Sequence, residues 1–198
     1  MNLEIWKQLE DAVANCRKCS LWKTRSNPVV GGGSKDAKVM FIGEAPGYWE
    51  DVKGRPFVGR AGRVLDELLE SINLSREEVY ITNILKCRPP NNRNPLQSEI
   101  EACTPYLDRQ IELMNPEIIA TLGNFALSYI SEKFGLDLEN VGGVHGKVFK
   151  IKTLFGDITI IPLYHPAAAV YNPALKEVLL RDIRAIRAAS DGNGAVKV

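Results

Sequence analysis

The sequence predicts an α/β fold in which helices cover both faces of a mainly parallel, four-stranded sheet. Four short β-rich runs alternate with segments of helical periodicity, and such alternation is typical of parallel sheets. The chain has 198 residues, 45% of them hydrophobic, which suffices for the core of one domain. We expect that domain to span residues 1–190 and residues 191–198 to form a flexible tail.

The periodicity of apolar residues places the individual elements along the chain. The expected strands are Lys38–Ile42, Val79–Ile84, Glu117–Leu122 and Asp157–Leu163. The expected helices are Leu3–Asn15, Ala61–Ile72, Pro105–Met114 and Asn172–Ala189. Pro105 is placed in the first turn of its helix, where a missing N–H breaks no hydrogen bond. Ser75 and Glu78 form a capping-box pattern that opens a short turn.

The charge balance excludes two classes of protein. Lys and Arg number 25 against 24 Asp and Glu, a formal net charge of +1, so the chain is neither a polycation nor an acidic solvating protein. Nucleic acid stays open as a partner, because a basic groove can coexist with an acidic back face. No apolar run approaches the roughly 20 residues of a membrane span, and no signal peptide is evident. We expect a cytoplasmic protein without disulfides.

Polar, glycine-rich and proline-rich residues follow each expected strand. The first strand runs into Gly43–Gly47, the second ends near Asn83, the third is followed by Gly123 and the fourth by His165. The carboxyl ends of parallel strands meet at one edge of a sheet, where α/β proteins bind their ligands. The sequence therefore predicts a cleft at that edge.

The four cysteines suggest a metal site. Cys16 and Cys19 form a two-residue knuckle, and Cys87 and Cys103 lie far downstream. Four unrelated buried cysteines are the alternative, but one four-ligand set accounts for all of them. Zinc and an iron–sulfur cluster both accept four thiolates. Only one knuckle is present, which favours a cluster, and a structural use is favoured over electron transfer because no flavin or nicotinamide site is evident.

The residues after the strands, together with the cysteine pattern, resemble the family 4 uracil-DNA glycosylases, the iron–sulfur type of thermophilic archaea and bacteria. The resemblance runs from Cys16 to about Arg187. The motifs that carry it are Gly43-Glu44-Ala45-Pro46-Gly47, Phe57-Val58-Gly59-Arg60-Ala61-Gly62, Asn83–Pro90 and His165-Pro166-Ala167-Ala168.

The resemblance implies a three-layer α/β/α fold and a structural [4Fe–4S] cluster. The implied cluster ligands are Cys16, Cys19, Cys87 and Cys103. It also implies hydrolysis of the bond between uracil and deoxyribose in single- or double-stranded DNA, which leaves an abasic site during base excision repair. No divalent metal is expected in the chemistry.

The implied roles match the chemistry of a flipped base. Phe57 would stack on uracil, and Asn83 would accept from N3–H and donate to O4. His165 would donate to O2 as that oxygen becomes anionic. Small residues at Gly43 and Ala45 would let the backbone approach the base closely.

Two acids in the first motif have implied roles as well. Glu44 would either orient the attacking water or stabilise the cationic sugar, and both roles stay open. Other glycosylase families place Asp or Asn where Ala45 stands. Without a carboxylate at this position, catalysis would depend on Glu44 and on stabilisation of the leaving group. Glu50 would fill the space that a thymine methyl group needs, with a solvated surface charge as the alternative.

The segment after His165 resembles the loop that enters the duplex, where an apolar wedge replaces the flipped base. Val170 and Tyr171 are the wedge candidates. The candidates for phosphate contacts are Arg60, Lys86, Arg88 and Arg93, each with an ordinary solvated charge as the alternative. For His145, a phosphate contact and a structural loop are both open.

Three rival functions are kept. They are a broader-specificity glycosylase of family 5, a non-catalytic sensor of DNA damage, and a redox protein that uses the cluster. The joint presence of Glu44, Asn83 and His165 argues for the narrow-specificity enzyme. We expect a monomeric prokaryotic protein that is associated with the nucleoid through DNA. Recruitment by a sliding clamp or a replication protein is left open.

Overall fold

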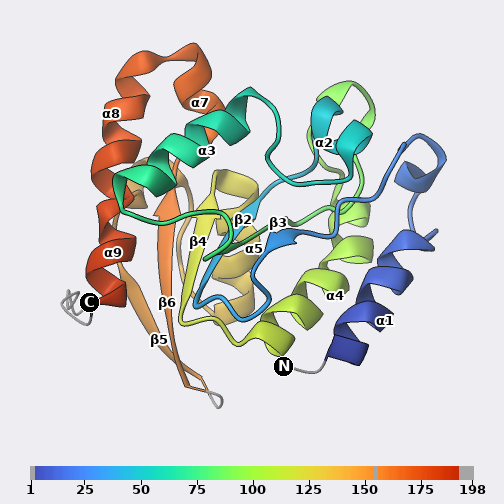
Figure 1. Ribbon diagram of the computed structural model, residues 1–198, viewed down its shortest axis with the longest axis horizontal. Coiled ribbons are helices and arrows are strands. Elements are labelled where there is room, and N and C mark those ends of the chain that lie inside the picture. The colour runs from blue at the N-terminus through green and yellow to red at the C-terminus, as the bar shows by residue number, and fades with distance from the viewer. Residues whose placement is uncertain (1–2, 154–155, 192–198) are drawn as a thin grey trace.

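The structure is a computed structural model that describes residues 3–153 and 156–191. A six-stranded sheet in the order β1-β3-β2-β4-β6-β5 lies between two layers of helices (Figure 1). The four inner strands β3, β2, β4 and β6 are parallel, and β1 and β5 are antiparallel edge strands. The three-layer, mainly parallel fold is confirmed.

The elements have the following bounds. The strands are β1 Gly32–Gly33, β2 Val39–Gly43, β3 Tyr80–Asn83, β4 Ile118–Leu122, β5 Phe149–Thr153 and β6 Gly156–Leu163. The α-helices are α1 Leu3–Ala14, α2 Tyr48–Lys53, α3 Arg60–Ser71, α4 Gln97–Met114, α5 Asn124–Phe134, α6 Val141–Val144, α7 Pro166–Tyr171, α8 Pro173–Asp182 and α9 Arg184–Ser190. Two 3-10 helices are η1 Ser20–Lys23 and η2 Pro90–Asn92.

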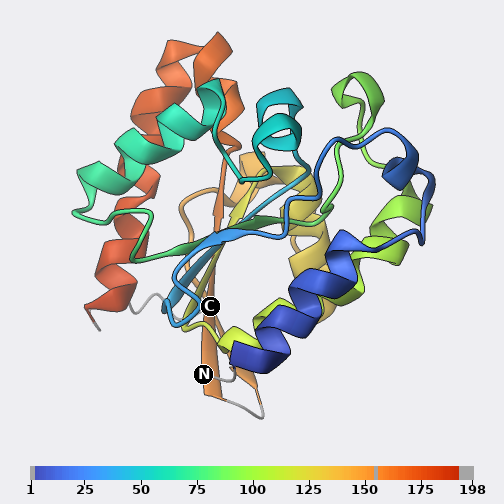
Figure 2. The same cartoon turned by 45° about the vertical axis from the view of Figure 1, so that its right-hand side comes forward.

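Each face of the sheet has its own apolar core. Alternate residues of β2 point to opposite faces, so Met40 joins the core under α1, α4 and α5, whereas Phe41 joins the core under α3, α7, α8 and α9. Figure 2 shows these two groups of helices on either side of the sheet. Side chains of the inner strands are therefore buried on both faces, which explains their continuous apolar runs.

The structure corrects the expected elements in three places. The sheet has six strands and not four, because β1 consists of two glycines and β5 was not recognised despite its alternating exposure. Helix α4 begins at Gln97, where the Glu99 carboxylate accepts from the Leu96 N–H, so Pro105 lies inside the helix. The expected helix Asn172–Ala189 is two helices that meet at Ile183.

The other expectations fall close to the observed bounds. The four expected strands agree with β2, β3, β4 and β6 to within one residue at each end. Glu78 accepts from the Ser75 backbone N–H at 2.9 Å, as the capping pattern predicted. Most of the expected tail, residues 192–198, lies outside the described residues. In the described part of the chain, no helix is long and apolar enough to cross a membrane.

Candidate active site

A cleft of about 570 Å³ lies at the carboxyl edge of the sheet, where the sequence predicted it. Its walls contain the predicted site residues Glu44, Ala45, Phe57, Asn83 and His165. They come from the ends of β2, β3 and β6 and from the loop before α3. Glu50, Arg60, Arg93, Val170 and Tyr171, which were also singled out, line the same cleft.

Main-chain pairing continues from the sheet into the cleft. Beyond the ends of β2 and β3, the Ile84 N–H donates to the Gly43 carbonyl and the Leu85 N–H donates to the Glu44 carbonyl, both at 3.0 Å. A Cβ atom at Gly43 would overlap Asn83 Oδ1 and the Phe57 ring. Glycine at this position therefore allows the amide and the ring to meet beside the β2 backbone.

Asn83 is buried with one polar atom unpaired. The residue is 2% exposed, and its Oδ1 has no hydrogen-bond partner among the described residues. An unsatisfied buried acceptor is unfavourable by about 1–3 kcal/mol. Since Asn83 lines the cleft, a ligand that brings an N–H donor would satisfy this oxygen.

His165 is held as a neutral imidazole. Its Nδ1 accepts from the Ala167 backbone N–H at 3.1 Å, which places the ring proton on Nε2. Burial lowers the pKa of His165 to about 4. The ring stacks near Phe57, with centroids 5.6 Å apart and planes inclined by 27°. The site therefore offers a neutral N–H donor beside an aromatic face.

Glu44 supplies a carboxyl group whose pKa lies above its ordinary value. Burial in the cleft wall is the cause of the raised pKa. A carboxylate in this environment accepts a proton more readily than one in water, as a general base must.

Glu50 uses both carboxylate oxygens to hold main-chain amides. Oε1 accepts from the N–H groups of Val58 and Gly59 at 2.8 and 2.9 Å, and Oε2 accepts from Gly47 N–H at 3.1 Å. The surface-charge interpretation of Glu50 is therefore wrong. Its carboxylate joins the β2–α2 loop to the loop that carries Phe57.

The structure contradicts the interpretation of Lys86 as a phosphate contact. Lys86 is 1% exposed. Its Nζ donates to Thr82 Oγ1 and Gln110 Oε1 at 2.7 Å and to the Asn83 carbonyl at 2.8 Å. Three buried acceptors within reach of one ammonium group draw the side chain inward, away from any DNA.

Two predicted arginines lie against aromatic rings, and a third is held by a carboxylate. Arg60 lies 5.6 Å from the centroid of Tyr171 and Arg88 lies 5.1 Å from that of Tyr48. Arg93 makes two bonds to the Glu99 carboxylate, at 2.9 and 2.6 Å. Arg60 and Arg93 line the cleft.

The cleft rim carries two aromatic residues that the sequence analysis missed. Tyr48 and Trp49 are 51% and 54% exposed, and Tyr171, a wedge candidate, is 77% exposed. All three line the cleft. The missed signal was two adjacent aromatic residues directly after a Gly/Pro-rich strand end, where no core position exists for them.

The four cysteines line one small hollow between η1 and the start of α4. Arg25 Nη1 donates to Cys87 Sγ at 3.0 Å, and the Lys86 N–H donates to Cys103 Sγ at 3.2 Å. Such donors suit thiolates. Among the described residues, however, no three Cys, His, Asp or Glu side chains are arranged to hold a single metal ion.

His145 lies apart from the cleft. Its Nδ1 is 2.5 Å from Asp182 Oδ2 on α8, and its ring lies 4.7 Å from that of Tyr164. Of the two roles left open for His145, these contacts favour the structural one.

Comparison with known proteins identifies the family of this chain. Residues 30–184 match the model of the uracil DNA glycosylase superfamily. Among its relatives, the type-4 uracil-DNA glycosylase of Saccharolobus solfataricus is 50% identical over 91% of this chain and 84% of its own. That of Archaeoglobus fulgidus is 48% identical over 88% and 87%. The type-5 enzyme of Thermus thermophilus is 33% identical over 56% and 57%.

The fold, the cleft and the matching model place the chain in the uracil-DNA glycosylase superfamily. Within that superfamily it belongs to the type-4 uracil-DNA glycosylases.

Proposed function

We propose that this chain excises uracil from single- or double-stranded DNA as the first step of base excision repair. The observation that carries the proposal is the buried amide of Asn83, a residue of the cleft wall, whose Oδ1 has no partner among the described residues. Uracil N3–H is a donor that satisfies it, and Asn83 Nδ2 donates to uracil O4. Cytosine has an acceptor at N3 and a donor at C4, so it leaves this oxygen unpaired.

The remaining residues suit the breaking of the N1–C1′ bond. Phe57 gives the flipped base a stacking surface. As the bond breaks, its electron pair moves to uracil, and the neutral His165 Nε2–H donates to O2. Glu44 accepts a proton from water, whose oxygen bonds to C1′, and its negative charge also favours the cationic sugar. Uracil and an abasic site are the products.

The rim and the cysteines complete the proposal. Arg60 and Arg88 contact phosphates, and Tyr171, the more exposed wedge candidate, enters the duplex beside Val170. Cys16, Cys19, Cys87 and Cys103 hold a structural [4Fe–4S] cluster, which is supported by their convergence on one hollow and by the donors beside them. Four thiolates are the donor set that a [4Fe–4S] cluster takes.

Excision is tested by incubating the protein with an oligonucleotide that contains one uracil, then cleaving abasic sites with alkali. We expect strand cleavage with uracil and none with a matched thymine strand. An intact uracil strand across pH and temperature contradicts the proposal. Visible absorption of the purified protein in the iron–sulfur charge-transfer region tests the cluster, since a zinc protein lacks it.

A further inference from the structure

The backbone of Phe57 has a conformation that its side chain does not favour. Among the described residues, five that are not glycine have positive φ, and four of these are asparagine. Asparagine tolerates this region because its short polar side chain bonds locally. The fifth is Phe57, with φ of 49°. Such a conformation persists only where the surroundings impose it.

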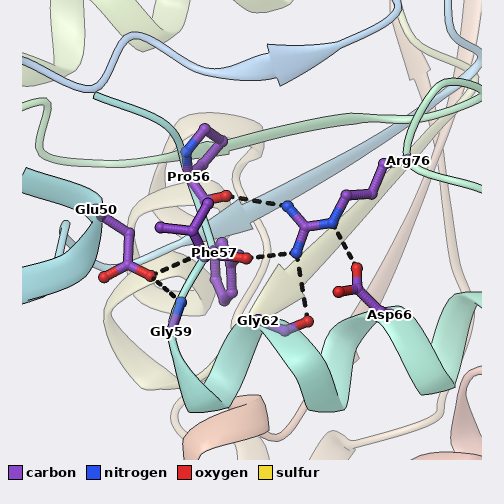
Figure 3. A network of polar contacts seen from close by, with 8 residues as sticks. Glu50, Pro56, Phe57, Gly59, Gly62, Asp66 and Arg76 are labelled. Atoms are coloured by element: carbon purple, nitrogen blue, oxygen red, sulfur yellow. Dashed lines mark hydrogen bonds and ion pairs between the residues drawn. The ribbon is translucent and has the colours of Figure 1, made fainter. Parts of the chain in front are cut away.

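The guanidinium group of Arg76 holds the carbonyl side of this segment. Nη1 donates to the Pro56 carbonyl at 3.1 Å, and Nη2 donates to the Phe57 carbonyl and to the Gly62 carbonyl at 3.3 Å. Nε pairs with the Asp66 carboxylate on α3 (Figure 3). The planar group thus ties two consecutive carbonyls to the first turns of α3, a pattern of donors that a lysine lacks.

The amide side of the same segment is held by Glu50, through its bonds from Val58 and Gly59. Figure 3 shows Glu50 and Arg76 on opposite sides of the Phe57 backbone. Helix α3 also approaches closely, since a Cβ atom at Gly62 would overlap the Phe57 carbonyl. The Phe57 backbone is therefore fixed between an anion, a cation and a helix.

Arg76 acts from outside the cleft. It lines a separate hollow together with Arg55 and Glu77, whereas the Phe57 ring lines the cleft. The ring also lies 5.6 Å from His165 and beside Gly43, so a change in its backbone would shift it against both. Of the residues to which Arg76 donates hydrogen bonds, Phe57 is the one that lines the cleft.

We infer that Arg76 is a positioning residue of this glycosylase, which holds the Phe57 backbone in the left-handed conformation that presents its ring to the base. The inference rests on the proposed stacking role of Phe57. The guanidinium group of Arg76 then has two functions. Its ion pair with Asp66 joins Arg76 to α3, and its bonds to the backbone carbonyls orient the Phe57 ring.

The test is a double-mutant cycle on single-turnover excision rates, measured with excess enzyme on a single-stranded uracil oligonucleotide. Arg76→Met should lower the rate at least tenfold. Phe57→Leu, which removes the ring but keeps an apolar side chain, should lower it as well. With the ring already gone, adding Arg76→Met to Phe57→Leu should lower the rate by no more than about twofold. Losses that multiply in the double variant overturn the inference.

Three variants separate positioning from stability. Arg76→Lys keeps a cation beside Asp66 but cannot reach all three carbonyls, so its rate should stay low; full rescue overturns the inference. Asp66→Asn removes only the ion pair and should lower the rate less than threefold. Arg109→Gln breaks an exposed pair with Glu112 far from the loop and should leave the rate unchanged. If Arg76→Met fails to fold, Arg76→Lys takes its place in the cycle.

The same double-mutant cycle distinguishes a failure of the stacking role of Phe57 from a failure of the positioning role of Arg76. A wild-type rate for Phe57→Leu contradicts the stacking role of Phe57 and the inference with it. A slow Phe57→Leu together with a wild-type rate for Arg76→Met contradicts the role of Arg76 alone.

Discussion

The side-chain ammonium of Lys86 lies 2.8 Å from the backbone carbonyl of Asn83, while the backbone N–H of Lys86 donates to Cys103 Sγ. One buried residue thus contacts both the strand end that we propose reads the base and a proposed cluster ligand. Lys86 therefore links the backbone of Asn83 to the cysteine hollow.

Replacing Lys86 by Met should both destabilise the protein and slow excision. The change removes the ammonium group that donates to the buried oxygens of Thr82, Asn83 and Gln110, so the free energy of unfolding should fall by about 1–3 kcal/mol. Denaturant unfolding and single-turnover rates measure the two effects. Lys133→Met, which breaks a partly exposed ion pair with Asp108, is the control and should change stability by less than about 1 kcal/mol. Wild-type excision by Lys86→Met contradicts the link to Asn83.

Asn83→Asp should weaken the selectivity for uracil over cytosine. A carboxylate cannot donate to uracil O4, and both of its oxygens can accept from the exocyclic amine of cytosine. Excision rates on oligonucleotides that differ only in uracil or cytosine measure the ratio. An unchanged ratio removes Asn83 from base recognition.

The positions of the site residues at the strand ends could be predicted from the sequence. The buried contacts that hold these residues in place could not. Parallel strands bring their carboxyl ends together, so Glu44, Asn83 and His165 could be placed at one cleft from their positions after expected strands. The burial of Lys86 could not be foreseen, because lysines are mostly exposed. The φ of Phe57 was equally hidden, since it depends on Arg76, a tertiary contact with no local signal.

His165 should act as a donor without being protonated. Its pKa of about 4 in the folded protein lies below the ordinary 6.5, so single-turnover rates should show no ionisation near pH 6.5. His165→Ala should lower the rate by two to four orders of magnitude, about 3–5 kcal/mol of lost leaving-group stabilisation. A rate limb centred at pH 6.5 that disappears in His165→Ala contradicts the neutral donor.

The same shift in pKa predicts how stability depends on pH. Below pH 6.5 the unfolded chain takes up a proton on this imidazole, whereas the folded protein stays neutral there until about pH 4. The contribution of His165 to stability should therefore be lost as the pH falls from 6.5 towards 4. Thermal unfolding of wild type and His165→Gln across this range isolates the effect, and parallel curves for the two proteins contradict it.

Glu44 should set the acidic limb of the pH–rate profile. A general base must be deprotonated, and burial raises the pKa of Glu44 above its ordinary 4.5, so the rate should fall as the pH drops through a value above 4.5. Glu44→Gln should remove this limb and leave a low, nearly pH-independent rate. Persistence of the limb in Glu44→Gln assigns it to another group.

Glu50 provides a choice between two roles. If its side chain excludes the methyl group of thymine, Glu50→Ala should gain excision of thymine from a thymine-containing strand. If its main role is instead to hold the amides of Gly47, Val58 and Gly59, Glu50→Ala should lose uracil excision without gaining thymine excision. In that case three N–H donors lose their acceptor, and the loop that carries Phe57 is no longer held. Since both carboxylate oxygens are already bonded to the backbone, we expect the loss of uracil excision.

Glu50→Gln, which is nearly the same size but offers only one acceptor oxygen, should also lose activity. Full activity in Glu50→Gln, with thymine excision in Glu50→Ala, contradicts the bracing role and supports the steric one.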